Sequence, residues 1–424
     1  MMALHQHRDS LRVQSGVSLI ELMVALVIAS LLGIGLIQIF GGTRAAFNSN
    51  SALARAQENS RFAIGFIEND LRMVGHLGLS NEQGYQSGNI FNHLSSDGRS
   101  NNINTPFLFR THQAVQGYGF TGTDAFNTVY PMPATPTVAA APTVGAAATA
   151  WSPALPTDLG LLGGGPAPQA LAGSDVLMLR FLSAANVPLR DITADASVSS
   201  NVDAAGNIHW DNTVPGLENF LAEGGIFALT NYSLLSLFQL GITTGPVANA
   251  AQGGKNAVGW PAVAGRFDEV DAYGRGSSLY RYEVSVYFVA EGADGQPALW
   301  RRRLGPSGDL LDAEELVPGV DMMQVTYGVV DTVPRAGDQP TRYLTAAQIE
   351  AGTWRGTSTD SSPRWADVVS VRVGLLMRSN LPSGNADETN FERNVGGMRI
   401  MPPDDRHMRH VYETQVALRN RSRG

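Results

Sequence analysis

An unbroken apolar run near the amino terminus constrains this chain more than any other feature of its sequence. Within residues 17–42 the only charged side chain is Glu21, and no proline interrupts the run. As a helix with a rise of 1.5 Å per residue, this run is about 39 Å long, more than the roughly 30 Å hydrocarbon core of a bilayer. The preceding residues 1–16 are polar and carry Arg8 and Arg12. The pattern predicts a transmembrane helix with its basic N-terminal side in the cytoplasm.

A cleaved secretory signal peptide is the alternative for an apolar N-terminal segment. Such a peptide has a shorter apolar core, followed by a cleavage site of small residues. Here the run is longer and no Ala-x-Ala follows it, but Gly16 stands immediately before it. An acidic residue inside an apolar span is unfavourable, which makes Glu21 a candidate functional residue. The alternative for Glu21 is a place at the interfacial end of the span, where a carboxylate is better tolerated.

The six residues from Gly16 to Glu21 (GVSLIE) resemble the processing site of type IV prepilins and type II secretion pseudopilins. The resemblance implies that a membrane aspartyl peptidase cuts after Gly16 on the cytoplasmic side and then methylates the new amine of Val17. It also implies that the apolar helix is retained, with Glu21 at the fifth mature position. Val17 stands where phenylalanine is commoner, although smaller apolar residues are accepted there.

Cleavage at this place would create a cationic amine one helical turn before Glu21. Val17 and Glu21 are four residues apart and share a helix face. A charge buried among packed helices is tolerated when it is paired. The spacing supports the hypothesis that Glu21 of one subunit meets the Val17 amine of another and selects one axial register.

The helical pattern continues beyond residue 42 and becomes amphipathic. Apolar side chains recur at three- and four-residue spacing, at Ile64, Ile67, Leu71 and Val74. Gly75 and Gly78 supply a stop signal. Residues 43–79 are therefore expected to continue the helix onto a globular domain, giving one helix over about 17–75.

Residues 58–78 (ENSRFAIGFIENDLRMVGHLG) resemble the helix end of large PilW-type minor pilins. Members of that family often carry a cysteine just after the last of these glycines. This chain has Leu79 there and no cysteine anywhere. Packing or hydrogen bonding must therefore replace a family disulfide, if the family has one at this place.

The remainder, residues 80–424, reads as a β-rich domain. Loops with short strands are expected over 80–130, and the Pro-, Ala-, Thr- and Gly-rich segment 131–172 is expected to be an exposed insertion without a core. Strands are expected from residue 176 and over 282–290, 298–304, 320–330, 368–377 and 410–418, with a hairpin turn at 292–297 and a helical or loop stretch near 215–240.

Three C-terminal segments extend the resemblance to the PilW-type pilins. They are residues 316–328, 365–379 and 412–421, and they follow the prepilin-like N-terminus in the family's order. The resemblance covers roughly 17–79 and 280–421 and is thin between them. It implies the pilin fold, an α+β architecture in which a long N-terminal helix, first transmembrane and then amphipathic, packs on a C-terminal β-rich domain.

Composition excludes several functional classes. Without cysteine, the chain has no disulfide framework, no Cys-ligated metal and no thiol nucleophile. The net charge of −8 gives no general attraction to nucleic acid. The 30 cationic residues are scattered, and all but Lys255 are arginine. We find no convergent catalytic set and no phosphate-binding loop, and we expect no cofactor and no bound metal.

Two segments carry weak metal-site patterns. His407 and His410, with Asp404 and Asp405 before them, could bind a metal, but a solvated polar connection accounts for them more simply. The run from Asn201 to Gly206, with Asp203, lacks the acidic ligands of an EF-hand, although a looser calcium loop stays open.

Arginine residues are close together in two short segments of the chain. Residues 301–303 (RRR) follow a strand pattern and are expected to protect an edge strand. We expect the same protection of an edge strand from Arg419, Arg421 and Arg423. A docking role is the alternative for these three residues.

The sequence favours a structural subunit over an enzyme. A minor pilin that helps to initiate or cap a type IV pilus is the first reading, with adhesion and twitching motility as the processes implied. A minor pseudopilin of a type II secretion system is the alternative, and a membrane-anchored exported enzyme is the least favoured. The implied partners are other minor pilins, the major pilin, the prepilin peptidase/N-methyltransferase, a tip adhesin and the inner membrane. The implied location is a single pass of the bacterial inner membrane, then the periplasm and the pilus.

Overall fold

The structure is a computed structural model. It describes residues 16–79, 90–98, 105–123, 126, 128–138, 150–162, 168–189, 202, 207–211, 213, 220–221, 223–241, 247–250, 253–259, 273–274, 276–330, 339–352, 364–380, 382 and 391–419. The chain divides into two compact units, Met1–Leu53 and Ala54–Gly424. The leader expected over residues 1–16 lies outside the described residues except for Gly16.

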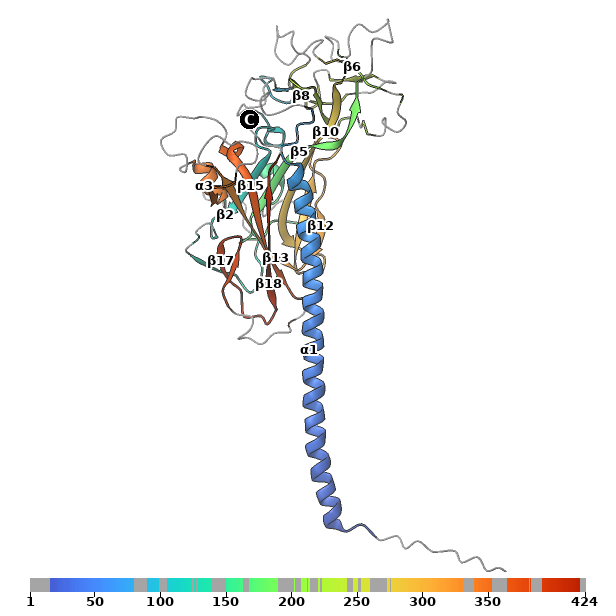
Figure 1. Ribbon diagram of the computed structural model, residues 1–424, viewed down its shortest axis with the longest axis vertical. Helices are drawn as coiled ribbons and strands as arrows, with labels where there is room; N and C mark the ends of the chain where they lie inside the picture. Colours follow the sequence, from blue (N-terminus) through green and yellow to red (C-terminus); the bar gives the residue numbers. More distant parts are fainter. Residues whose placement is uncertain are drawn as a thin grey trace, which may run out of the picture. The chain divides into compact units, whose positions relative to one another are not determined.

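The first element is the long helix α1, Leu19–Met73 (Figure 1). It confirms the helix expected over about 17–75, to within two residues at each end. The helix ends before Gly75, whose φ of 76° is the left-handed conformation that commonly terminates helices. Gly78 is also left-handed, and a Cβ added there would lie 2.7 Å from the ring of Tyr280, so the chain needs a glycine at this exit from the helix.

The larger unit contains a mostly antiparallel sheet of nine described strands (Figure 1). Its main path runs β1 (Ile90–Asn92), β8 (Leu235–Gln239), β7 (Ile226–Thr230), β10 (Ser278–Glu291), β5 (Val176–Pro188), β2 (Val115–Phe120) and β4 (Trp151–Ser152). β11 (Pro297–Arg303) pairs with β10, and β12 (Glu314–Pro318) pairs with β11. The hairpin expected at 292–297 is confirmed as the connection between β10 and β11.

A second sheet has the order β14 (Arg342–Leu344), β13 (Val320–Val329), β15 (Val368–Arg378) and β18 (Arg409–Ala417). Two smaller sheets join β16 (Arg393–Val395), β17 (Met398–Met401) and β3 (Val129–Pro131), and β6 (Asn207–His209) with β9 (Val247–Asn249). The described helical pieces of this unit, besides α1, include α3 (Ala346–Ala351) and the 3-10 turns η1 (Phe107–Phe109), η2 (Thr157–Leu159) and η6 (Arg364–Asp367). The expected strands over 298–304, 320–330, 368–377 and 410–418 are confirmed.

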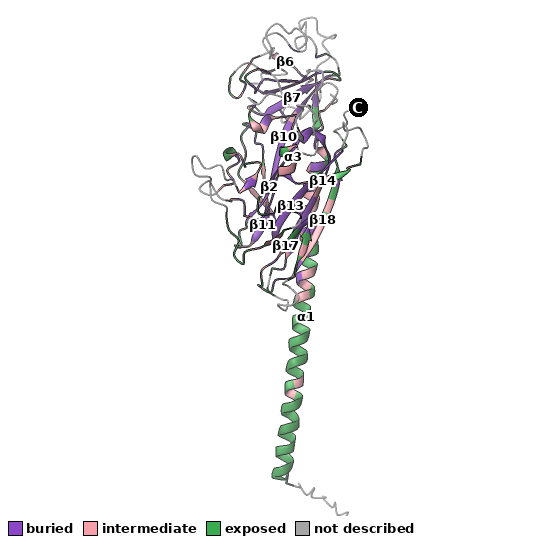
Figure 2. Cartoon of the chain, turned by 90° about the vertical axis from the view of Figure 1, so that its left-hand side faces the viewer, coloured by how far each residue is buried: buried purple, intermediate pink, exposed green. Residues whose placement is uncertain are grey.

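β10 shows how two cores form on opposite faces of the large sheet. Tyr287 and Val289 pack with the apolar stripe of α1 and with the second sheet. Their neighbours Val286 and Phe288 point to the other face and pack in a separate core. Both faces are therefore buried, as the colouring of Figure 2 shows for the central strands, and α1 from Ala54 onward is one wall of the first core. The expected α+β fold, a long N-terminal helix on a β domain, is confirmed.

The expectation of a helical or loop stretch near 215–240 is wrong. Residues 226–239 form the strands β7 and β8, joined by a turn in which the Asn231 side chain accepts hydrogen bonds from the backbone N–H groups of Ser233 and Leu234. These strands are buried on both faces, so their sequence lacks the alternation that marks a half-buried strand.

The expectation that 131–172 is an exposed insertion without a core is wrong for its described parts 150–162 and 168–172. Six of their apolar residues are buried: Trp151, Leu155, Leu159, Leu161, Ala170 and Leu171. The Trp151 indole N–H also donates to the Ser174 carbonyl oxygen at 2.9 Å. These parts contribute large apolar side chains to the core on the far side of the sheet, which their Pro- and Gly-rich composition conceals.

Leu79 occupies the position where the resembling family often has cysteine. Its side chain packs at the border of the second core, and its backbone N–H donates to Thr230 Oγ1 at 3.1 Å. Packing and a hydrogen bond thus hold the chain at this place.

Candidate processing and assembly site

Gly16, Val17 and Ser18 form a short non-helical lead into α1. Val17 is 73 % exposed, and a Cβ added at Gly16 would meet no atom within 4 Å. The fold of this chain therefore does not require glycine at position 16. A requirement for glycine there would come from a partner that handles the segment, and the predicted cut between Gly16 and Val17 stays a prediction.

Glu21 lies in the first turn of α1, where its carboxylate Oε2 accepts a hydrogen bond from the Ser18 backbone N–H at 3.2 Å. Ser18 and Glu21 have the Ser-x-x-Glu spacing of a capping box, in which the acidic side chain reaches back to the residue before the helix. A carboxylate at a helix N-terminus also interacts favourably with the helix dipole. The structure thus holds the Glu21 carboxylate beside the backbone that cleavage would turn into a free N-terminus.

The first part of α1 is apolar and almost entirely exposed (Figure 2). The helix contains a window long and apolar enough to cross a membrane, and none of that window is buried. Large apolar side chains such as Ile37 and Phe40 are more than 70 % exposed. An apolar surface of this extent has no partner within its own unit, which indicates a membrane anchor.

The last part of α1 is tied to β10 and β11 by polar contacts beside the apolar stripe. The hydroxyl of Tyr287 donates to Asp70 Oδ2 at 2.6 Å and lies 3.1 Å from the Phe66 carbonyl oxygen. Burial raises the pKa of Tyr287, so the phenol keeps its proton and remains a donor. Arg301 Nη1 lies 3.8 Å from the Asp70 carboxylate, and Arg301 Nη2 lies 2.8 Å from Glu314 Oε1.

The expected edge-strand role of residues 301–303 is wrong, because β11 lies between β10 and β12. Each arginine makes its own contacts instead. Arg301 reaches α1, Arg302 donates to the carbonyl oxygens of Leu159 and Leu311, and Arg303 pairs with Glu314.

Two known protein families resemble parts of this chain. Residues 286–420 match the model of the family described as type IV pilus-assembly protein W, and residues 11–37 match that of the prokaryotic N-terminal methylation motif. The C-terminal third of the chain is thus similar to the PilW-type pilins, and its N-terminus is similar to the prepilin-type methylation motif. The N-terminal match includes Gly16, Val17 and Glu21 and supports a class III type of processing motif. The first match runs from within β10 to the end of β18, and residues 38–285 lie outside both matches. No curated protein and no solved structure matches the chain.

The histidines weighed as metal ligands make other contacts in the pilin. His407 Nε2 accepts from Arg378 Nη2 at 2.8 Å, and Nδ1 lies 2.7 Å from the Ser379 carbonyl oxygen. Because a guanidinium cannot accept, the ring is the neutral tautomer with its proton on Nδ1. Burial lowers the pKa of His407 and favours the same neutral form. Among the described residues no three His, Asp or Glu side chains gather as a metal site.

A buried charge network that the sequence did not reveal lies beside His407. Arg409 Nε donates to Asp321 Oδ2 at 2.6 Å, and the two side chains are 1 % and 2 % exposed. Arg409 also donates to both carboxylate oxygens of Asp405. Burial by itself would raise the pKa of the Asp405 carboxyl group. The hydrogen bonds that it accepts lower that pKa below its ordinary value. The 88 residues between Asp321 and Arg409 explain why no spacing signal announces the pair.

The remaining sequence candidates divide between described and undescribed residues. The calcium-loop pattern at Asn201, Asp203 and Gly206 and the terminal Arg421 and Arg423 lie outside the described residues, whereas Arg419 is described and exposed. Asp404 is exposed, and the carboxylate of Asp405 accepts a hydrogen bond from Arg409.

Proposed function

We propose that this pilin is a minor subunit that takes part in type IV pilus assembly, at initiation or in the tip complex, and that its role is structural and not enzymatic. The observation that carries the proposal is the start of α1, where an exposed, non-helical Gly16–Ser18 segment leads directly into an apolar helix with a carboxylate in its first turn. An exposed, extended segment suits entry into a peptidase site.

Glu21 is well placed for the assembly contact. Its Oε2 accepts the Ser18 N–H, and within the described residues its Oε1 makes no hydrogen bond. The second oxygen is thus left to accept from the Val17 amine of a neighbouring subunit. Pairing there would relieve the unfavourable burial of both charges among packed helices, so it would favour the axial register that brings them together.

The proposed partners follow from this chemistry. They are the prepilin peptidase/N-methyltransferase, the inner membrane that holds the apolar helix, other minor pilins, the major pilin and a tip adhesin. The precursor spans the inner membrane once with its N-terminus in the cytoplasm, and the β-rich unit enters the periplasm and later the pilus. Adhesion and twitching motility are the cellular processes this role would serve.

Two substitutions at Glu21 test the pairing. Glu21→Ala removes both the charge and the acceptor for the Ser18 N–H, whereas Glu21→Gln keeps an acceptor and removes only the charge. Both variants are expected at normal membrane level, because a neutral side chain eases insertion. Both are expected to lose capture of other minor pilins by cross-linking and to reduce surface pili at least tenfold, since an unpaired buried charge costs several kcal/mol.

The Gln variant separates two roles of the carboxylate. Normal piliation with Glu21→Gln and loss with Glu21→Ala would assign Glu21 to helix capping and end the charge-pair mechanism. Normal piliation with both variants would leave Glu21 without a role in assembly, while the processing-site argument would stand.

A minor pseudopilin of a type II secretion system is the second candidate, because the N-terminal methylation motif and apolar helix serve both machines. Deletion of the gene separates the two. Loss of surface pili with normal secretion of exported enzymes supports the pilus role, and the opposite pattern assigns the chain to secretion.

A further inference from the structure

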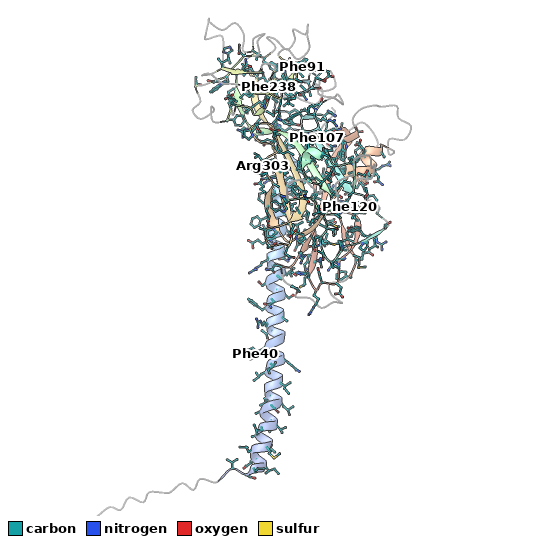
Figure 3. All side chains as sticks on the ribbon, turned by 180° about the vertical axis from the view of Figure 1, so that it is seen from behind. Phe40, Phe91, Phe107, Phe120, Phe238 and Arg303 are labelled. Carbon is teal, nitrogen blue, oxygen red and sulfur yellow. The ribbon has the colours of Figure 1, made fainter. Side chains whose placement is uncertain are left out.

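A pocket of about 480 Å³ opens on the larger unit and shares no residue with the proposed processing site. Its walls are residues 106–109 around η1, Asp158 of η2, Lys255, Arg302 of β11, and residues 308–310 after β11. The volume lies in the range of pockets that hold small molecules. Phe107, labelled in Figure 3, belongs to the wall formed by η1.

Lys255 is the single lysine of the chain, and its loop is held rigidly at the pocket. The side-chain amide of Gln239 accepts from the Lys255 backbone N–H at 2.7 Å and donates to the carbonyl oxygens of Gly224 and Ser307. One amide therefore ties together three loops. The Lys255 ammonium lies 2.7 Å from Asp309 Oδ1, so the cation is positioned before any ligand arrives.

Arg302 supplies a second positioned cation. Its Nη1 donates to the Leu159 carbonyl oxygen at 2.6 Å and its Nε donates to the Leu311 carbonyl oxygen at 2.9 Å. These bonds hold the guanidinium between two loops. Within the described part of the chain its Nη2 group makes no hydrogen bond, which leaves donors for a ligand.

The other groups of the pocket differ in character. Phe107, Leu108 and Leu310 give an apolar wall that is half-buried at the border of the second core. Asp158 and Asp309 stand exposed at the rim and can accept hydrogen bonds. A matching ligand needs an acidic group, several hydroxyl donors and an apolar face.

We infer that this pocket binds an acidic saccharide. The sugar carboxylate takes the donors of Lys255 and Arg302, the hydroxyls bind Asp158 and Asp309, and the C–H face of the ring packs on Phe107. A fatty acid would leave the two rim carboxylates without donors.

The single lysine provides a direct probe. Reductive methylation of the full chain in detergent micelles with ¹³C-formaldehyde labels Lys255 and the N-terminal amine, and the label keeps the charge of each. Lys255→Met identifies the lysine signal by its absence. Titration with trigalacturonate is expected to shift that signal saturably with a Kd of about 1 mM or tighter, and titration with neutral maltotriose is expected to be at least tenfold weaker.

Calorimetry on unlabelled variants gives an independent reading. Lys255→Met and Phe107→Ala are each expected to weaken trigalacturonate binding at least tenfold. Arg72→Met removes a cation and Phe391→Ala removes an aromatic ring at exposed positions that do not line the pocket, and both variants are expected to bind as the wild type does.

Three outcomes would overturn the inference. The first is no saturable response to trigalacturonate up to about 10 mM. The second is an equal response to maltotriose, which would exclude an acidic ligand class. The third is a saturable response to a short peptide with a free C-terminal carboxylate and none to trigalacturonate, which would make the pocket a peptide site.

Discussion

The phenolic hydroxyl of Tyr287 on β10 donates to the Asp70 carboxylate of α1 at 2.6 Å. Tyr287 is fully buried, and 217 residues separate the two in the sequence. The contact ties the last turns of α1 to the large sheet, beside the apolar stripe that packs in the same core.

Tyr287→Phe is expected to destabilise the pilin by about 1–3 kcal/mol, since it leaves the Asp70 carboxylate without its buried donor. The measurement is the urea midpoint of unfolding. Tyr412→Phe is the matched control, because Tyr412 packs against the same core and its hydroxyl makes no hydrogen bond within the described residues. Equal effects of the two substitutions would show that the Tyr287 hydrogen bond contributes nothing.

Asp321→Asn tests the buried charge network. It removes the carboxylate that Arg409 and Arg378 share, and leaving buried guanidinium groups underpaired costs about 3 kcal/mol. Glu392→Gln breaks the ion pair with Arg399 at the surface and is expected to leave the midpoint unchanged. An unchanged midpoint for Asp321→Asn would contradict the stabilising role of the network.

Stability is expected to fall as the pH drops below about 6.5, the ordinary pKa of histidine. Burial lowers the pKa of His407, His410 and His76 in the folded pilin. At a pH below the pKa that these histidines have in the unfolded chain, the unfolded chain therefore binds more protons than the folded one. The stability from each neutral ring is complete above that pKa and is lost as the pH falls toward the folded value, by at most about 1.4 kcal/mol per pH unit and ring.

His407→Asn is the variant that measures this effect. Urea midpoints between pH 7.5 and pH 5 are expected to fall less steeply for His407→Asn than for the wild type. Parallel pH profiles would show that His407 does not contribute.

Trp151→Ala tests whether the low-complexity segment contributes to the core. Loss of this buried side chain and its hydrogen bond to Ser174 is expected to cost about 3–5 kcal/mol. Phe62→Ala, at a position 57 % exposed on α1, is expected to change stability by no more than about 0.5 kcal/mol. A Trp151→Ala protein as stable as the wild type would indicate that the segment is an insertion that contributes nothing to the core.

Sequence reasoning succeeded where a local pattern carries the structure. The apolar run and the spacing of Ile67, Leu71 and Val74 predicted α1, and alternating or continuous apolar runs predicted the strands from β10 onward. It failed at β7 and β8, because strands buried on both faces have no period to distinguish them from a buried helix.

The functional residues divide in the same way. Gly16 borders the apolar run and Glu21 is the one charged residue within it, so both could be recognised as candidates from the sequence. Asp321, Arg409 and the groups around Lys255 come together only in the fold, from segments tens of residues apart. No spacing in the sequence announces such sites.

The central claim is that the chain is cut after Gly16 and kept as a pilin with Val17 at its N-terminus. The most direct measurement is mass spectrometry of the N-terminal peptide of the protein purified from the membrane, for the wild type and for Gly16→Glu. Because position 16 contacts nothing in the fold, Gly16→Glu changes access for the peptidase and leaves folding alone. We predict a wild-type peptide that begins at N-methylated Val17 and a Gly16→Glu protein that retains residues 1–16. A wild-type protein that keeps residues 1–16, or one cut beyond the apolar helix, would contradict the account.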